Sequence, residues 1–146
     1  MKKFELTTEF ITVFGIKLFR IKAIRAFGNV EAGELGGFVE KEENLSHNGD
    51  AWVYGDAGVY GNAGVSGDAW VLKKTHLFQV GALGSRNRFT TFFRTKNKEI
   101  FVTCGCFEGN IDKFEKAVEE THGGTKHEQT YKTAIALAKL QIDLEE

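Results

Sequence analysis

Three arginines stand among phenylalanines between residues 86 and 94, and this is the stretch whose residue types most clearly suggest a binding site. Guanidinium groups bind phosphate with two hydrogen bonds, and aromatic rings stack on planar bases. If the segment is a strand, alternate side chains share a face. One face then carries Arg86, Arg88, Thr90, Phe92 and Arg94, and the other carries Phe89, Thr91 and Phe93. The first face is the predicted ligand-binding face, on a concave surface, and the second is predicted core.

The arginines belong to a charge block that the net charge of −1 conceals. Residues 73–98 contain seven basic residues and no acidic one, whereas residues 99–146 contain five basic and ten acidic residues. A local positive block favours an anion-facing surface. The alternative is that the block pairs internally with the acidic C-terminal segment. The chain as a whole is not basic enough for a general binder of duplex DNA.

Histidine and cysteine offer weaker candidates for chemistry. A zinc site would need Cys104, Cys106, His122 and His127, but this spacing is not a standard one, and Cys104 alternates with Val102 as a buried thiol would. His47 and His76 have no orienting carboxylate evident in the sequence. No paired carboxylates or Ser-His-Asp pattern stand out, so we predict no catalytic residue, no metal and no cofactor.

Four successive hexapeptides of the form Gly-(Asp/Asn)-Ala-x-Val-x fill residues 49–72. One aliphatic residue in every six suits a chain that turns a corner every six residues. We expect the valines to point inward, the alanines to sit at crowded corners, and the Gly-Asp and Gly-Asn pairs to form tight turns. The valines are Val53, Val59, Val65 and Val71, and the alanines are Ala51, Ala57, Ala63 and Ala69.

This pattern resembles the hexapeptide-repeat family, whose members form a left-handed parallel β-helix with 18 residues per coil. The six-residue phase continues through Leu77, Leu83 and Phe89, which implies about two coils. The coil would place Trp52, Trp70 and Arg88 in one outward column, and Trp70 joins the predicted ligand-binding residues as a stacking surface. The alternative is that Trp52 and Trp70 are covered by a neighbouring chain or by the protein's own N-terminal strands.

The flanking segments predict a mainly β protein with C-terminal helices, an α+β fold. We predict a hairpin from residues 5–13 and 17–27, followed by turns over residues 28–37. We also predict two strands, at residues 88–95 and 99–104. A helix over 111–121 has Asn110 as its N-cap and stops at Gly123-Gly124, and a last helix covers about 128–144. We therefore divide the chain into an N-terminal hairpin and glycine-rich cap (1–48), a short β-helix (49–89) and a strand-strand-helix-helix segment (90–146).

The last helix is apolar on more than one side, which favours a homo-oligomer, with a trimer expected before a dimer. No apolar run reaches the ~20 residues that a membrane span needs, so no membrane partner is expected. Two cysteines separated by one residue do not favour a disulfide, which suggests a reducing cytoplasm.

Three flanking segments, residues 21–46, 84–94 and 104–123, resemble small hypothetical proteins of phages and prophages. This resemblance implies the cytoplasm of a bacterial host cell. Together with the basic block, it predicts a non-catalytic oligomeric binding protein that sequesters an anionic small molecule, such as a nucleotide signal of host defence. Two alternatives are an acyltransferase-like enzyme, as in many hexapeptide proteins, and a protein–protein inhibitor that uses the acidic helices.

Overall fold

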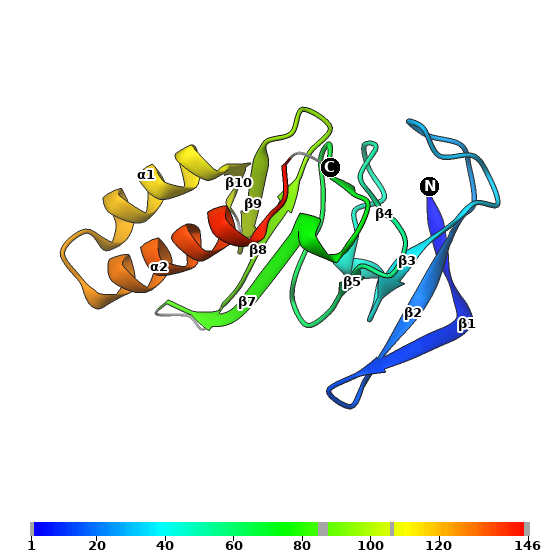
Figure 1. The fold of residues 1–146 in the computed structure, drawn as a ribbon, viewed down its shortest axis with the longest axis horizontal. Coiled ribbons are helices and arrows are strands. Elements are labelled where there is room, and N and C mark those ends of the chain that lie inside the picture. The colour runs from blue at the N-terminus through cyan, green and yellow to red at the C-terminus, as the bar shows by residue number, and fades with distance from the viewer. Residues whose placement is uncertain (1, 85–87, 106, 145–146) are drawn as a thin grey trace.

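The computed structural model describes residues 2–84, 88–105 and 107–144. It has a mixed α+β fold, with strands in several sheets and two helices at the C-terminal end (Figure 1). The predicted α+β class with C-terminal helices is therefore confirmed. The hairpin of the first two strands lies at one end of the molecule and the helices at the other (Figure 1).

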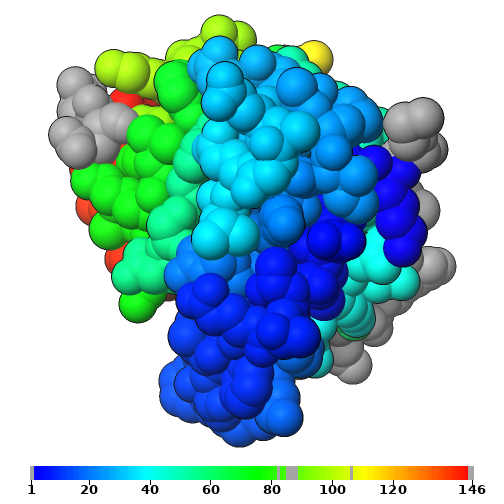
Figure 2. Space-filling model, turned by 90° about the vertical axis from the view of Figure 1, so that its right-hand side faces the viewer, coloured from blue at the N-terminus to red at the C-terminus, as the bar shows by residue number. Residues whose placement is uncertain are grey.

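The N-terminal sheet contains β1 (Phe4–Val13), β2 (Ile16–Ala23), β3 (Leu35–Val39) and β5 (Gly58–Val59), in that order. The predicted hairpin is confirmed, and Phe14 and Gly15 form its turn with φ of 50° and 81°. Figure 2 shows the tip of this hairpin as a lobe that projects from the body.

Residues 28–37 were predicted to be turns only, but β3 begins inside this segment. A Cβ at Gly36 would lie 2.7 Å from Trp52 Cζ2, and a Cβ at Gly37 would lie 2.6 Å from the carbonyl oxygen of Ala57. Glycine is used here because another backbone approaches closely, not because the chain turns.

The hexapeptides form short strands joined by tight turns. β4 (Trp52–Val53) pairs in parallel with β6 (Trp70–Val71), so Trp52 lies beside Trp70 and Val53 beside Val71, as the 18-residue spacing predicts. All four valines and all four alanines of the repeats are buried. The glycine that opens each repeat has a φ between 60° and 72° at Gly49, Gly55, Gly61 and Gly67. Inward valines and glycine-based turns are thus confirmed.

The predicted β-helix of about two coils is not shown, and the six-residue phase ends after residue 72. A 3₁₀ turn over Lys74–His76, like the earlier one over Glu42–Asn44, leads into an antiparallel sheet of β7 (Leu77–Leu83), β8 (Arg88–Arg94), β9 (Ile100–Cys104) and β10 (Phe107–Asn110), in the order β10-β9-β8-β7. The expected continuation of the coil through Leu77, Leu83 and Phe89 is therefore wrong. Phe92 and Phe93 lie in different cores, a period of two that an antiparallel sheet satisfies and a six-residue coil does not.

The C-terminal helices are α1 (Ile111–His122) and α2 (Lys126–Gln141). The predicted cap is confirmed, because Asn110 Oδ1 accepts a hydrogen bond from the Lys113 amide at 2.9 Å. The helices pack on one face of the antiparallel sheet, and the hexapeptide turns pack on the other. Strand β8 therefore separates two cores, with Phe93 in the first and Phe92 in the second.

Candidate functional site

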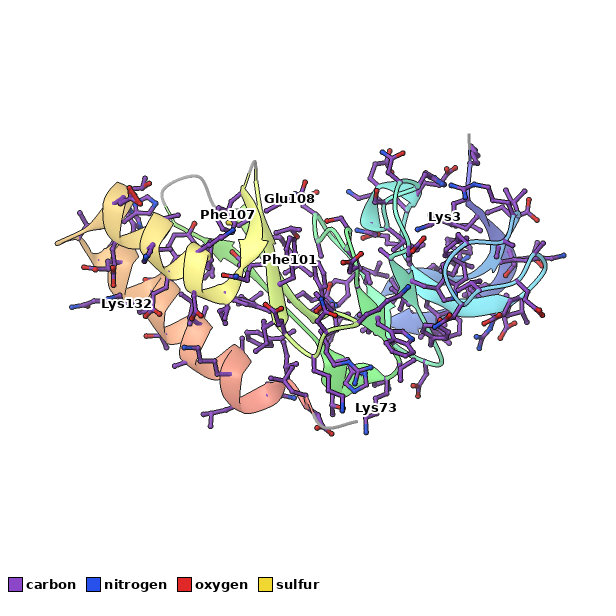
Figure 3. All side chains as sticks on the ribbon, turned by 90° about the horizontal axis from the view of Figure 1, so that it is seen from above. Lys3, Lys73, Phe101, Phe107, Glu108 and Lys132 are labelled. Carbon is purple, nitrogen blue, oxygen red and sulfur yellow. The ribbon has the colours of Figure 1, made fainter. Side chains whose placement is uncertain are left out.

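A cavity of about 420 Å³ opens between the hexapeptide turns and the β9–β10 hairpin. Its wall combines one aromatic ring with hydroxyl, amide, thiol and carboxylate groups. The lining residues are Glu43, Ser46, Asn62, Gly64, Val65, Ser66, Phe89, Thr103, Cys104, Gly105 and Glu108. Figure 3 shows Glu108 at the boundary between the helical half of the molecule and the turns. The cavity therefore lies where two units built from different parts of the chain meet.

On the side of the turns, buried Asn44 fixes the wall. Its Oδ1 accepts hydrogen bonds from the amides of Glu40 and Lys41, and its Nδ2 donates to the carbonyls of Gly61 and Ala63. All four hydrogen bonds of this amide are made. The chain around Asn44 is thereby held against the third hexapeptide, and the cavity edge with it.

On the side of the sheet, two threonines join the strands to the same hexapeptide. Thr103 Oγ1 donates to the carbonyl oxygen of Gly64. The Gly64 amide donates to Thr91 Oγ1 at 3.1 Å. These contacts fix the distance between the two walls through Gly64 and Thr103, which themselves line the cavity.

The charge of the cavity is negative. Glu43 and Glu108 are exposed at its edge, and Ser66 Oγ donates to Glu108 Oε1 at 3.2 Å. Lys41, which does not line the cavity, donates a hydrogen bond from Nζ to Asn62 Oδ1 at 3.2 Å. Among the described lining residues there is no Lys, Arg or His. Such a wall favours N–H and O–H donors and disfavours phosphate.

The predicted ligand-binding face of β8 is not an open surface. Thr90 and Phe92 are fully buried, and Arg94 is 2% exposed. Phe92 packs in the second core against Phe114, with the ring centroids 6.0 Å apart. The prediction of a concave face at these positions is wrong because the two helices cover that side of the sheet. Arg86 and the side chain of Arg88 lie outside the described part of the structure, so binding by these two residues remains a prediction.

Arg94 and Trp70 do come together, but inside the molecule. The Arg94 guanidinium lies 5.6 Å from the Trp70 ring, and its Nε and Nη2 donate to the Trp70 carbonyl. A guanidinium on Trp70 was predicted for Arg88; the one that the structure describes there is that of Arg94, and the side chain of Arg88 lies outside the described part. Trp52 is buried against Phe4 and Phe27, with ring centroids 6.2 and 5.2 Å away. The alternative that the protein's own N-terminal segment covers Trp52 is confirmed.

Part of the positive block is paired with aspartates. Lys74 lies 3.9 Å from Asp56, and Lys96 lies 3.6 Å from Asp50. Only one described pair, Lys73 with Asp143 at 3.6 Å, joins the block to the acidic C-terminal segment. Among the described ion pairs, the predicted pairing with the acidic C-terminal segment is made by Lys73, whereas Lys74 and Lys96 pair with aspartates of the hexapeptide turns.

The histidines are held by local contacts. His47 has an orienting carboxylate after all, because its Nε2 lies 3.1 Å from Glu42 Oε1 while its Nδ1 accepts from the Lys3 amide. His47 also stacks on Phe4, with centroids 4.3 Å apart. His76 is buried, and its Nδ1 accepts from the Leu72 amide at 3.0 Å. Neither imidazole lines the cavity.

The residues considered as zinc ligands do not form a metal-binding cluster among the residues that the structure describes. His122 and His127 have ring centroids 5.6 Å apart at the α1–α2 connection. Cys104 is half-buried and accepts a hydrogen bond from Thr90 Oγ1 at 3.2 Å. Cys106 lies outside the described residues. Within residues 2–84, 88–105 and 107–144, no group of three or more His, Cys, Asp or Glu side chains could hold a metal ion.

Lys3 is a fully buried cation that was not predicted from the sequence. Lys3 Nζ donates to the Ala51 carbonyl at 2.6 Å and lies 4.5 Å from the centroid of the Phe27 ring. Burial, followed by the nearby Arg25 charge, lowers the pKa of Lys3 to about 8, while Asp50 acts in the opposite direction. The contacts tie the N-terminus to the first hexapeptide. In the sequence, the apolar neighbour Phe4 is the only feature that could have indicated the burial of Lys3.

No protein-family model matches the sequence, and no curated protein matches it. Neither described helix is both long enough and apolar enough to cross a membrane.

Proposed function

We propose that this protein is a non-catalytic binding protein that holds a small, flat, hydrogen-bond-donating molecule in the cavity between the hexapeptide turns and the β9–β10 hairpin. The lining of the cavity is the observation that carries the proposal. A volume of about 420 Å³ lies within the range of small-molecule sites. The hexapeptide resemblance implies a stack of short coils next to an α/β unit. Such a stack would form one wall of the cavity.

The ligand class follows from the lining. Phe89 contributes an aromatic ring to the wall, against which a planar ring of the ligand can pack. The carboxylates of Glu43 and Glu108 accept hydrogen bonds from ring or exocyclic N–H groups, and the side chains of Ser46 and Asn62 suit ligand hydroxyls. The base and sugar of a nucleoside combine these features.

A phosphate group is disfavoured inside this cavity because two carboxylates stand at its edge. The sequence-based proposal of an anionic ligand, such as a nucleotide signal sequestered in the cytoplasm of a bacterial host, therefore depends on Arg86 and Arg88. An acyltransferase reaction has less support, since none of the described lining residues is a histidine that could take a proton from an acceptor.

Isothermal titration calorimetry with a panel of nucleosides and their nucleotides tests the proposal. We expect a nucleoside to bind with micromolar affinity and to remain chemically intact. Glu108→Gln should weaken this binding by about 10-fold, because a hydrogen bond to a charged group contributes about 1.5–3 kcal/mol and a neutral amide keeps part of it. Glu120→Gln, an exposed carboxylate on α1, is the matched control and should change nothing.

Two results would overturn the proposal. The first is that no nucleoside binds the unmodified protein. The second is that nucleotides bind more tightly than nucleosides and lose this advantage in Arg88→Gln, which would place the ligand at the arginines instead of the cavity.

A further inference from the structure

The surface formed by α2 and strand β7 is an apolar feature that the described fold leaves uncovered. A groove of about 480 Å³ runs between the two elements. Its lining is mostly apolar: Phe78, Val80, Leu83, Lys126, Gln129, Thr130, Thr133, Ala134 and Leu137. Beyond the groove, Leu140 is 85% exposed, and Leu137 is 47% exposed. Exposed leucines beside an apolar groove indicate a contact surface.

The groove coincides with the open edge of the antiparallel sheet. Strand β7 is the last strand in the order β10-β9-β8-β7, so its outer backbone groups face away from the sheet. Helix α2 packs over β7, and α1 packs over β9 and β10. A molecule that covers the groove therefore meets the side of α2 and the edge of β7 together.

We propose that this surface, the α2–β7 surface, binds the same surface of a second copy of this chain, with the two α2 helices antiparallel about a two-fold axis. The exposed stripe of α2 is self-complementary. It contains Lys126 at its start, Thr130 and Thr133 in the middle, and Leu137 and Leu140 at its end. These residues follow the i, i+3, i+4 spacing of one helix face, and the stripe contains no acidic residue.

Antiparallel packing explains the order of residues in this stripe. It brings the Leu137 and Leu140 end of each helix to the Lys126 end of its partner, so the butylene stem of the lysine covers leucine. Each Lys126 ammonium then lies beside the carbonyl end of the partner's α2, where the helix dipole favours a cation. The small threonines fall near the axis and let the helices approach closely. A parallel arrangement would place two Lys126 charges together.

Helix α2 has 16 residues and is about 24 Å long, so the stripe, the groove and the edge of β7 form one elongated contact surface. A stable interface buries about 800 Å² on each partner, which is the area that this surface must supply in the dimer. This inference is independent of the proposed ligand, because the groove and the cavity lie on opposite faces of the antiparallel sheet.

Light scattering after size-exclusion chromatography of the full chain at micromolar concentration is the first test. We expect twice the mass of one chain for the unmodified protein. Leu137→Arg should raise the dissociation constant by about 30-fold or more, the effect of losing a central contact. Lys139→Ala, at an exposed position about 140° around the helix from the middle of the stripe, is the control and should remain dimeric. Circular dichroism confirms that both variants are folded.

Cross-linking tests the two-fold axis. Under mild oxidation, Thr133→Cys should give disulfide-linked dimers above the level that the native cysteines of the unmodified protein produce, and Lys139→Cys, on the other side of α2, should not. A monomeric mass for the unmodified protein, a trimer, an undiminished mass for Leu137→Arg, or no additional cross-link at Thr133→Cys would each overturn the proposal.

Discussion

The two cores on either side of β8 differ in the kinds of residues that they contain. The first core contains the valines and alanines of the hexapeptides, one of each in every six residues, together with residues of the N-terminal sheet. The second core contains large residues from a sheet and two helices, among them Phe92, Phe114 and Tyr131. In the first core, covalent spacing along the chain places each residue. In the second, contacts between distant segments place them, so the two cores should respond differently to substitution.

The largest effect is expected in the first core. Val65 is 1% exposed and lies beside Leu45 through a parallel bridge. Val65→Asp buries a carboxylate without a partner, which costs several kcal/mol and should unfold the protein. Denaturant titration followed by circular dichroism measures this change. A variant that stays folded with an unchanged midpoint would mean that the hexapeptide turns tolerate water at their centre.

A smaller loss is expected in the second core, where it also tests whether the cores unfold together. Phe92→Ala should lower the free energy of unfolding by about 3–5 kcal/mol, because it leaves a cavity between β8 and the helices. Tryptophan fluorescence reports on the first core through Trp52 and Trp70, and the far-ultraviolet helical signal reports on the second. We expect the two signals to change at the same denaturant concentration, because Phe93 joins β8 to the first core.

The same two signals have a clear contrary outcome. If Phe92→Ala loses the helical signal at a lower denaturant concentration than the tryptophan signal, the cores are separate folding units. Phe93→Ala then serves as the comparison, since it should affect the tryptophan signal first.

The smallest effect concerns pH and Lys3. Its pKa is lowered to about 8 in the folded protein from an ordinary value of 10.5, so between these values the unfolded chain binds more protons than the folded one. The Lys3 contribution should therefore make the protein more stable as pH rises from about 8 toward 10.5, with its full penalty present below pH 8. Lys3→Met should show a shallower rise in unfolding free energy over this window, measured by denaturant titration at each pH. Identical slopes would show that Lys3 keeps an ordinary pKa.

The repeat is the part of the fold that could be predicted most fully from the sequence. The frame Gly-(Asp/Asn)-Ala-x-Val-x predicted the buried valines, the turns at positive φ and the register of Trp52 with Trp70, and all three are observed. Each of these features depends on residues within one or two turns of the chain. The hairpin around Phe14-Gly15 and the Asn110 cap are local in the same sense.

The candidate site could not be predicted in this way, because its walls come from different units. Alternation along β8 correctly divided its residues between two faces, but the sequence could not show that helices cover one face and hexapeptide turns the other. Phe92 therefore lies in the second core instead of on a ligand-binding face. Only tertiary packing brought Glu43, Phe89 and Glu108 around one cavity.

Local spacing determined the turns, strands and caps of this protein, since backbone conformation and side-chain direction depend on near neighbours. Tertiary structure decided which charged and aromatic groups face solvent. That choice depends on which apolar faces meet, and a free energy of burial summed over distant segments decides it. Arg94 shows the difference: alternation puts it on the face of Phe92, which the helices cover, whereas tertiary packing places its guanidinium 5.6 Å from the ring of Trp70 in the hexapeptide turns.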